Sequence, residues 1–377
     1  MGAHTYFATT SKGLEGVLAD EITALGGKRI AAGQGGVSFS GDRELCYRAN
    51  LWLRTANRIL LHLSEFPAHT PEALYEGVKA IPWPDLFAVR NSIAVEASVR
   101  DSAITHSHFA AQKTKDAVVD RFREAIRARP DVDPSAPDVR IHLRIVRDAC
   151  TLSLDTSGES LNRRGYRADP ADASLRETVA AGIVLLAGWD GQVPLADPTC
   201  GAGTILIEGA LLATRTAPGL LRASFGFQKH ADYKPKLWSS LLDEAKDSVR
   251  RDVAGRVEGF DISPEVIRGA GRNAQRAGVS DIVSFQRGDI RGFSPGETAG
   301  VIICNPPYGI RIPGEEGGIE EFYRAMGEAF KKRCRGWTAY VLSGNPAATR
   351  HIGLKASRRF PLMNGPIDCR LLKYELY

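Results

Sequence analysis

The first 156 residues mix helical and strand patterns without the regular alternation of a parallel sheet. Apolar residues at helical spacing predict helices over residues 13–25, 72–80 and 107–128. Short alternating or β-rich runs predict strands over residues 6–9, 37–39, 92–99, 139–146 and 150–154. Residues 45–63 are predicted to be a helix that runs into a strand. We therefore expect α+β structure in this part of the chain.

From about residue 174 onward, predicted strands alternate with predicted helices. The helices are expected over residues 175–186, 205–213 and 264–277. The strands are expected over residues 193–196, 256–260, 282–286, 300–304 and 337–343. Such alternation is typical of an α/β, doubly wound and mostly parallel sheet. The dipeptide Asn364-Gly365 predicts a hairpin before residues 367–377, so we expect an antiparallel last strand at the sheet edge.

These changes of pattern predict where the domains begin and end. Residues 1–44 form the first unit and residues 45–156 the second. A segment rich in Ser, Gly, Arg and Pro, residues 157–173, is predicted to be a linker to the last domain, residues 174–377. Residues 220–252, which carry several aromatic side chains, are predicted to be an insertion in that domain.

Composition excludes several classes of protein. The 377 residues are 43% hydrophobic and 25% charged, so disorder and fibrous repeats are excluded. The six cysteines show no metal-ligand spacing, so neither a metal site nor a disulfide framework is expected. No apolar run could span a bilayer, and the first residues do not resemble a signal peptide. We therefore expect a cytoplasmic protein without membrane contact.

A glycine-containing segment lies between a predicted strand and a predicted helix. It reads Asp197-Pro198-Thr199-Cys200-Gly201-Ala202-Gly203-Thr204. The two glycines let the backbone approach a ligand closely, and the N-terminus of the following helix offers free N–H groups. No Lys-Ser or Lys-Thr follows, so this is not a phosphate-binding P-loop. On this loop alone, a nucleotide site and an unliganded tight turn are equally good interpretations.

Two aspartates follow later strands of the predicted sheet. Asp261 and Asp289 stand at carboxyl ends of strands, where a doubly wound fold binds its ligands. Asp261 can accept hydrogen bonds from ribose hydroxyls, and Asp289 can accept one from an adenine amino group. Either aspartate alone would more often cap a helix. Their recurrence on successive strands favours a ligand site.

The most specific motif is Asn305-Pro306-Pro307-Tyr308-Gly309, directly after an apolar strand. Two consecutive prolines hold the chain extended and offer carbonyl acceptors without N–H donors. Such an arrangement suits an exocyclic amino group, which is a donor, and Tyr308 supplies a flat face for a base. The alternative, a rigid turn at a strand end, is less favoured because the motif follows an apolar strand and the glycine loop lies upstream of it.

This combination resembles the class I S-adenosylmethionine (SAM)-dependent methyltransferases that modify amino nitrogens. The resemblance implies that Asp261 binds the ribose and Asp289 the adenine of SAM. The implied cofactor-binding residues are Asp197, Pro198, Cys200, Gly201, Gly203, Thr204, Asp261, Ile262, Asp289, Ile290 and Asn305. The implied catalytic residues are Asn305, Pro306, Pro307 and Tyr308. One departure is the 58-residue distance from Gly203 to Asp261, where about 20 residues are usual.

The resemblance extends over nearly the whole chain. The segments Tyr6-Phe7-Ala8-Thr9, Gly13-Leu14-Glu15 and Leu161-Asn162-Arg163-Arg164-Gly165-Tyr166-Arg167 resemble those of THUMP-containing RNA methyltransferases, especially the RlmL-type enzymes. It implies a ferredoxin-like region, a THUMP domain and a Rossmann-like catalytic domain. Arg163, Arg164, Tyr166 and Arg167 are predicted to bind RNA, because an aromatic side chain among arginines can stack on single-stranded bases. RlmL often occurs fused to a second methyltransferase, RlmK. Because this chain ends at Tyr377, only the first activity is expected.

By this resemblance the reaction is methylation of the N2 amine of a guanine in 23S rRNA, or in its assembly precursor, by a monomeric enzyme. The nitrogen lone pair is delocalised into the ring, so the amine is a poor nucleophile. We hypothesise that the Asn305 side-chain oxygen and the Pro306 carbonyl accept its two hydrogens, while Tyr308 stacks on the flipped base. Catalysis then depends on orientation and electrostatics, without a metal.

Several other functions stay open. DNA adenine-N6 and protein-glutamine methyltransferases share the Asn-Pro-Pro-Tyr motif, but the N-terminal region and the arginine-rich linker favour RNA. A tRNA guanine-N2 methyltransferase of the same architecture is the hardest to exclude. A non-catalytic RNA-binding or ribosome assembly factor is disfavoured by the intact motifs. Cys304 as a nucleophile for pyrimidine methylation is disfavoured because that chemistry needs a cysteine where Tyr308 stands.

Charge adds one further observation. The net charge of +5 is mild, but residues 331–377 hold ten Lys and Arg against two Asp and Glu. The basic charge is thus concentrated in a segment that follows the predicted active site. A second basic group lies on the helix predicted over residues 107–128, and a solvated helix face is its commoner interpretation. Its members are Lys113, Lys115, Arg121, Arg123 and Arg127.

Overall fold

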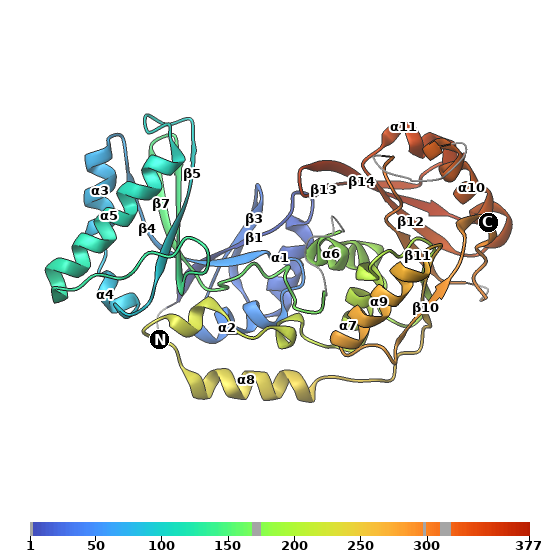
Figure 1. The fold of residues 1–377 in the computed structure, drawn as a ribbon, viewed down its shortest axis with the longest axis horizontal. Helices are drawn as coiled ribbons and strands as arrows, with labels where there is room; N and C mark the ends of the chain where they lie inside the picture. The colour runs from blue at the N-terminus through green and yellow to red at the C-terminus, as the bar shows by residue number, and fades with distance from the viewer. Residues whose placement is uncertain (1–2, 168–174, 297–298, 310–317) are drawn as a thin grey trace.

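The computed structural model describes residues 3–167, 175–296, 299–309 and 318–377, which form two seven-stranded sheets. Figure 1 shows an elongated molecule with the N-terminal sheet on the left and in the middle, and the C-terminal sheet on the right. The described part contains no helix that is long and apolar enough to cross a membrane. The last part of the predicted linker, residues 168–173, lies outside the described residues.

The N-terminal sheet has the order β2-β3-β1-β4-β7-β6-β5. Its strands are β1 His4–Thr9, β2 Lys28–Gly33, β3 Gly36–Gly41, β4 Arg58–Pro67, β5 Ile93–Arg100, β6 Val139–Val146 and β7 Ala149–Asp155. Only the pairing of β5 with β6 is parallel among these described strands. Its helices are α1 Glu15–Ala24, α2 Arg43–Trp52, α3 Pro71–Lys79, α4 Trp83–Leu86 and α5 Ser107–Ile126. The α+β prediction is confirmed.

Strand β4 joins the two N-terminal units into one sheet. Its first residues pair with β1, and the rest of the strand pairs with β7. The units nevertheless keep separate cores, one around Leu18 and Phe39 and the other around Phe122 and Leu143. Helix α2, which the boundary predicted at residue 44 assigns to the second unit, packs in the core of the first. The boundaries themselves stay predictions.

The C-terminal sheet has the order β10-β9-β8-β11-β12-β14-β13. Its strands are β8 Leu195–Asp197, β9 Val257–Asp261, β10 Val283–Arg287, β11 Val301–Cys304, β12 Thr338–Ser343, β13 Arg358–Asn364 and β14 Ile367–Glu375. Its helices are α6 Glu177–Ala187, α7 Thr204–Ala213, α8 Pro235–Asp247, α9 Pro264–Arg276, α10 Gly318–Arg333 and α11 Pro346–Thr349. Neighbouring Ile303 and Ile302 face opposite sides, Ile303 toward α6 and α7 and Ile302 toward α10. The doubly wound α/β prediction is therefore confirmed.

The hairpin predicted at Asn364-Gly365 is present and joins β13 to β14. Gly365 has a φ of +59°, a conformation that suits glycine in this turn. The last strand is antiparallel as predicted, but its predicted edge position is wrong. Strand β14 lies between β12 and β13, because its hairpin partner β13 takes the edge.

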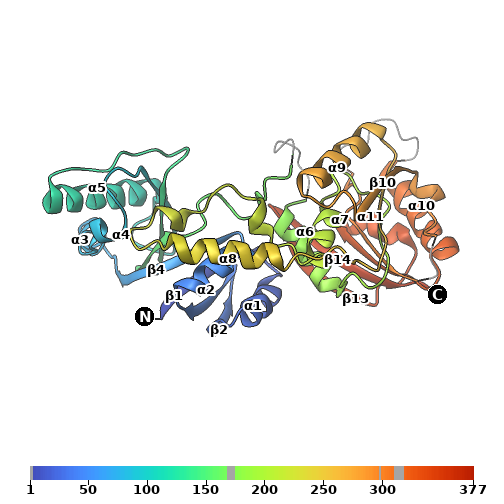
Figure 2. The same cartoon turned by 90° about the horizontal axis from the view of Figure 1, so that it is seen from below.

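The insertion between α7 and β9 packs on the N-terminal region. Helix α8 lies beside α2 in both views of the fold (Figures 1 and 2). Tyr47 of α2 stacks on Phe227 at a centroid distance of 4.3 Å and meets Trp238 edge-on at 6.0 Å. Arg48 makes two hydrogen bonds of 2.7 Å to the Glu244 carboxylate. Aromatic packing, which is strong per unit of area, thus holds the C-terminal domain on the N-terminal one.

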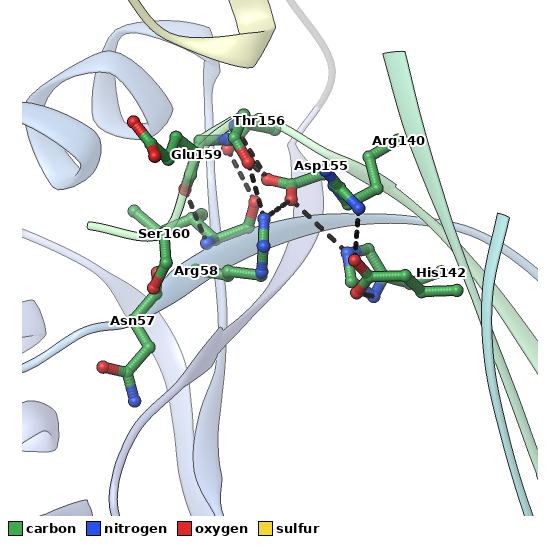
Figure 3. Close-up of polar contacts among 12 residues, drawn as sticks. Asn57, Arg58, Arg140, His142, Asp155, Thr156, Glu159 and Ser160 are labelled. Carbon is green, nitrogen blue, oxygen red and sulfur yellow. Dashed lines mark hydrogen bonds and ion pairs between the residues drawn. The ribbon is translucent and has the colours of Figure 1, made fainter. Parts of the chain in front are cut away.

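A buried charge cluster lies where β4, β6 and β7 meet (Figure 3). Asp155, at the end of β7, is 1% exposed and pairs with Arg58 of β4. Its carboxylate also accepts the Ser157 N–H at 2.7 Å and lies 3.4 Å from Nε2 of His142. Burial by itself would raise the pKa of Asp155, but His142, Arg58 and the Ser157 N–H together lower it. The cluster joins the two halves of the N-terminal sheet.

Candidate functional site

A cavity of about 370 Å³ opens at the carboxyl ends of β8, β9, β10 and β11. The order of the strands reverses between β8 and β11, and this switch point is where doubly wound sheets bind ligands. Its lining residues come from all four strand ends and from α10. They are Pro198, Thr199, Gly201, Asp261, Ile262, Gly288, Asp289, Ile290, Asn305, Pro307 and Phe322. The tertiary structure thus brings eight of the predicted cofactor and catalytic residues, Pro307 among them, to one cavity.

The glycine loop adopts the close turn that its sequence suggests. The Cys200 N–H donates to the Phe260 carbonyl at 2.8 Å, which ties the loop to β9. Gly203 has a φ of +78°, and a Cβ there would lie 2.7 Å from the Phe285 ring. Gly201 has a φ of +53°, and no atom lies within 4 Å of the position of its missing Cβ. Gly203 is therefore required for packing, whereas Gly201 keeps the cavity wall open.

Both aspartates that follow strands line the cavity. Asp261 accepts the N–H of Ser263 at 2.9 Å and that of Gly201 at 3.3 Å. Ser263, not Asp261, caps α9. Asp289 caps the short 3-10 helix Ile290–Gly292 by accepting the Arg291 N–H at 2.8 Å. The capping interpretation is thus wrong for Asp261, while Asp289 both caps a turn and lines the cavity.

The Asn-Pro-Pro-Tyr loop forms the opposite wall. Pro307 is exposed and lines the cavity with Asn305, whereas Pro306 is buried. The Tyr308 hydroxyl donates to the Asn305 Oδ1 at 2.6 Å, and burial raises the pKa of Tyr308. The Tyr308 ring is half-buried and lies near Gly344, and its hydroxyl accepts a hydrogen bond of 3.7 Å from the Cys369 thiol. Tyr308, which does not line the cavity, therefore orients the Asn305 amide. The second lone pair of the Asn305 Oδ1 is still available to accept a hydrogen bond from a ligand.

Three cavity residues are absent from the predicted sets: Thr199 and Gly288, which stand next to predicted residues, and Phe322, which lies far from them in the sequence. Phe322 comes from α10, a helix outside the elements predicted from sequence. Tyr323, Met326 and Phe330 share its buried side, an apolar helical spacing that could have identified the helix. Only the folded chain places one of these residues beside Asp261 and Asn305.

Six predicted residues of the cofactor and catalytic sets lie outside this lining, and one of them, Asp197, is described in the next paragraph. Cys200 and Thr204 are buried behind the loop, where the Thr204 hydroxyl accepts a hydrogen bond of 3.0 Å from Arg167. The remaining three are Gly203, Pro306 and Tyr308, whose positions are given above. Cys304 is fully buried, and burial raises the pKa of its thiol well above the usual value. This confirms the expectation of a buried strand-end thiol.

Asp197 also lies beneath the cavity rather than in its lining. It is 2% exposed, and its Oδ1 accepts the Thr199 N–H at 2.9 Å, which shapes the loop. Burial, with a smaller contribution from the Asp261 charge, raises the pKa of Asp197 from 3.8 to about 7. The carboxyl group of the protein without ligand therefore titrates near neutral pH.

A pH dependence of stability follows from Asp197. A raised folded-state pKa means that its contribution is fully present below about pH 4 and is lost as pH rises through about 7. We expect the wild type to lose about 1 kcal/mol of unfolding free energy between about pH 6 and about pH 8 from this group. Denaturant unfolding at both pH values should show a smaller loss for Asp197→Asn. An unchanged loss in the variant would contradict the assignment.

The predicted RNA contacts in the linker are corrected by the structure. Arg164 and Tyr166 are each 1% exposed, so neither can reach RNA. The Tyr166 hydroxyl donates to Glu208 at 3.1 Å, and Arg164 donates to the Leu161 carbonyl at 2.7 Å. The prediction that Arg164 and Tyr166 bind RNA is wrong, because both side chains are buried and donate their hydrogen bonds to the Glu208 carboxylate and to backbone carbonyls.

The other two linker arginines differ from each other. Arg167 is half-buried and lies 3.1 Å from Glu177, so it ties α6 to the start of α7. Arg163 is exposed and pairs with Glu159 at 2.5 Å, and it stays a predicted RNA contact. On α5, Lys115 pairs with Asp116 and Arg123 with Asp120, which supports the solvated-face interpretation.

Three family models match the chain. The RlmL ferredoxin-like domain matches residues 5–60, the THUMP domain residues 68–155, and the RMKL-like methyltransferase domain residues 164–373. The chain is 42% identical to slr0064 of Synechocystis sp., a protein whose name assigns it to the RNA methyltransferases, over 99% of this chain and 97% of the relative. It is also 42% identical to the ribosomal RNA large subunit methyltransferase K/L of Syntrophotalea carbinolica, over 98% of this chain. This chain spans about half of that K/L relative, 53% of its length.

Solved structures agree with this assignment of the fold. SMU.472, crystallised with SAH, has a TM-score of 0.90 and 31% identity, with 100% of this chain and 99% of that chain covered. A Listeria monocytogenes protein named for N6-adenine-specific DNA methylation has a TM-score of 0.90 and 32% identity, covering 100% and 97%. TrmN from Thermus thermophilus, at 21% identity and a TM-score of 0.73, shares the fold over 99% of this chain and 100% of that chain.

Proposed function

The chain belongs to the RMKL-like methyltransferase family, with an RlmL ferredoxin-like domain and a THUMP domain before the catalytic one, and from this premise we propose that it methylates a guanine N2 amine in large-subunit ribosomal RNA. The observation that carries the proposal is the cavity at the switch point. There the Asn305 amide faces a wall that contains two aspartates. The names of the K/L relatives support ribosomal RNA as the substrate.

The cavity has the chemistry that SAM requires. We assign Asp261 to the ribose hydroxyls and Asp289 to the adenine end, because carboxylates accept hydrogen bonds from both groups. Ile262, Ile290 and Phe322 offer apolar surface for the adenine ring. Gly201 leaves room for close approach of the ligand to the backbone. When bound, SAM supplies an electrophilic methyl group carried on its sulfonium.

The residues of this chain then orient the guanine amine. We propose that the Asn305 Oδ1 and the Pro306 carbonyl accept its two N–H groups, which favours a pyramidal nitrogen with a more available lone pair. The Tyr308 hydroxyl holds the Asn305 amide in place, which makes Tyr308 a positioning residue in the described conformation. The proposal includes stacking of the flipped base on the Tyr308 ring, as hypothesised from the sequence. Pro306 and Pro307 carry no N–H that would compete for these acceptors.

The N-terminal domains select the RNA in this proposal. They comprise the first 155 residues, which the chemistry of the cavity does not require. We propose that the ferredoxin-like and THUMP domains bind the RNA, in agreement with the THUMP match over residues 68–155. The insertion that packs on α2 then determines the distance from the RNA-binding region to the cavity.

Mass mapping of modified nucleosides tests the proposal. In vitro transcribed 23S rRNA and total tRNA are each incubated with the protein and SAM, then digested and analysed by mass spectrometry. We expect N2-methylguanosine in the 23S rRNA alone. N2-methylguanosine in tRNA alone would assign the protein to the tRNA alternative. N6-methyladenosine in either RNA would contradict the guanine assignment, and no product with either RNA would favour an assembly factor.

A further inference from the structure

A second cavity, of about 470 Å³, lies next to the Asn-Pro-Pro-Tyr loop and has no role in the function above. It is formed by the end of β12, by α11 and the 3-10 helix Arg350–Ile352, and by β13 and β14. Its lining includes four cations, which are Arg350, Lys355, Arg359 and Arg370. No carboxylate is among the described residues that line it.

These four cations are exposed, and none forms an ion pair with a carboxylate in the described ranges. By contrast, some other cations of residues 331–377 do pair with carboxylates: Lys332 lies 2.9 Å from Glu328, and Lys373 lies 2.7 Å from Glu375. Like charges in one concave site repel each other and raise the local positive potential. Such a site attracts an anion.

The donors of the cavity match a phosphodiester. Arginine guanidiniums bind phosphate oxygens through two parallel N–H donors, and lysine adds a point charge. Ser343 and Thr349 also line the cavity, but their hydroxyls bond within the chain, Thr349 to the Pro346 carbonyl and Ser343 to the Asn345 N–H, so the cations supply the donors. Leu372 and Tyr374, both buried, add apolar surface at its base. A phosphate with an attached sugar would meet both kinds of surface.

Hydrogen bonds connect this cavity directly to the catalytic loop. The Tyr323 hydroxyl lies 3.0 Å from Ser343 Oγ in the cationic cavity and donates to the Pro307 carbonyl at 3.3 Å. The Asn345 amide, two residues beyond Ser343, donates to the Tyr308 carbonyl at 3.0 Å. The β12–α11 turn therefore lines the cationic cavity and bonds to the loop whose residues Asn305 and Pro307 line the first cavity.

We propose that the cationic cavity binds backbone phosphates of the substrate RNA next to the target nucleotide. The inference rests on the proposed function only for the identity of the RNA, because phosphate recognition does not depend on base sequence. Holding the strand beside the loop would position the flipped nucleotide and would lower the KM for RNA without contributing to the chemical step. Arg350 and Arg370, one from each side of the cavity, are the test positions.

The test compares two double variants that remove equal charge. Arg350→Ala/Arg370→Ala removes two cations from the cavity, whereas Lys332→Ala/Arg335→Ala removes two exposed cations near the opposite end of β12. Binding of a short single-stranded RNA of mixed sequence is measured by fluorescence anisotropy at several salt concentrations. We expect the cavity variant to raise the Kd about tenfold and to reduce the salt slope by about one per lost phosphate contact.

The control variant should match the wild type in Kd and salt slope, and SAM affinity should be unchanged in both variants. Equal RNA binding by the cavity variant and the control variant would overturn the proposal. The same applies if the cavity variant lowers kcat but leaves KM for RNA unchanged. If RNA binding depends on the cavity while no guanine is methylated, the proposed function fails and the phosphate site stands.

Discussion

Replacing Asn305 by alanine is expected to lower methyl transfer to RNA by about a hundredfold or more, because the amide oxygen is the proposed acceptor of the amine. The effect should fall on kcat, since the interaction is needed most when the nitrogen becomes pyramidal. Single-turnover assays with saturating SAM and RNA measure it directly. Calorimetric titration with SAM serves as the check on folding and on the cofactor cavity.

Tyr308→Phe is the matched milder change. It removes the hydroxyl, which donates to the Asn305 Oδ1 at 2.6 Å and accepts from the Cys369 thiol at 3.7 Å, but keeps the ring near Gly344. Loss of one orienting hydrogen bond should lower kcat about tenfold. Wild-type turnover in Asn305→Ala, with SAM binding intact, would show that another group holds the amine. An effect of Tyr308→Phe as large as that of Asn305→Ala would contradict the positioning role.

Asp155→Ala should destabilise the N-terminal region by about 3 to 5 kcal/mol, the range for a buried ion pair that loses one partner. The substitution leaves Arg58 without its carboxylate (Figure 3), and it leaves the Ser157 N–H without its acceptor. Denaturant unfolding measures the loss. Asp243→Ala, an exposed carboxylate paired with Lys246 on α8, is the control and should change stability by less than about 0.5 kcal/mol.

The pH dependence gives an independent measure of the same cluster. Asp155 has a lowered folded-state pKa, so its contribution is present above the unfolded pKa and is lost as pH falls through the folded one. The variant Asp155→Asn keeps the shape and removes the charge, so its unfolding free energy should decline less steeply on acidification. If Asp155→Ala were as stable as Asp243→Ala, the cluster would not join the two halves of the sheet.

Much of the candidate site could be predicted from local sequence. The glycine loop, Asp261, Asp289 and Asn305 each follow a strand with a readable pattern, and strand order in a doubly wound sheet places such ends together. The pattern could not include Phe322, because its place in the cavity depends on where α10 packs. The position of β14 within the sheet could not be predicted either, since a hairpin signal specifies the partner strand but not which of the two strands lies at the edge.

The basic residues show most clearly the difference between what the sequence determines and what the tertiary structure decides. The sequence by itself determined that the chain carries arginines in its linker and a basic C-terminal segment. Only the tertiary structure decided that Arg164 is buried near Glu208, 44 residues away, while Arg350 and Arg370 meet in an open cavity. Side-chain type and spacing are local properties, so motifs and element order can be read along the chain. Burial and pairing depend on partners brought together by folding, and these decide whether a cation holds the fold or remains available to a ligand.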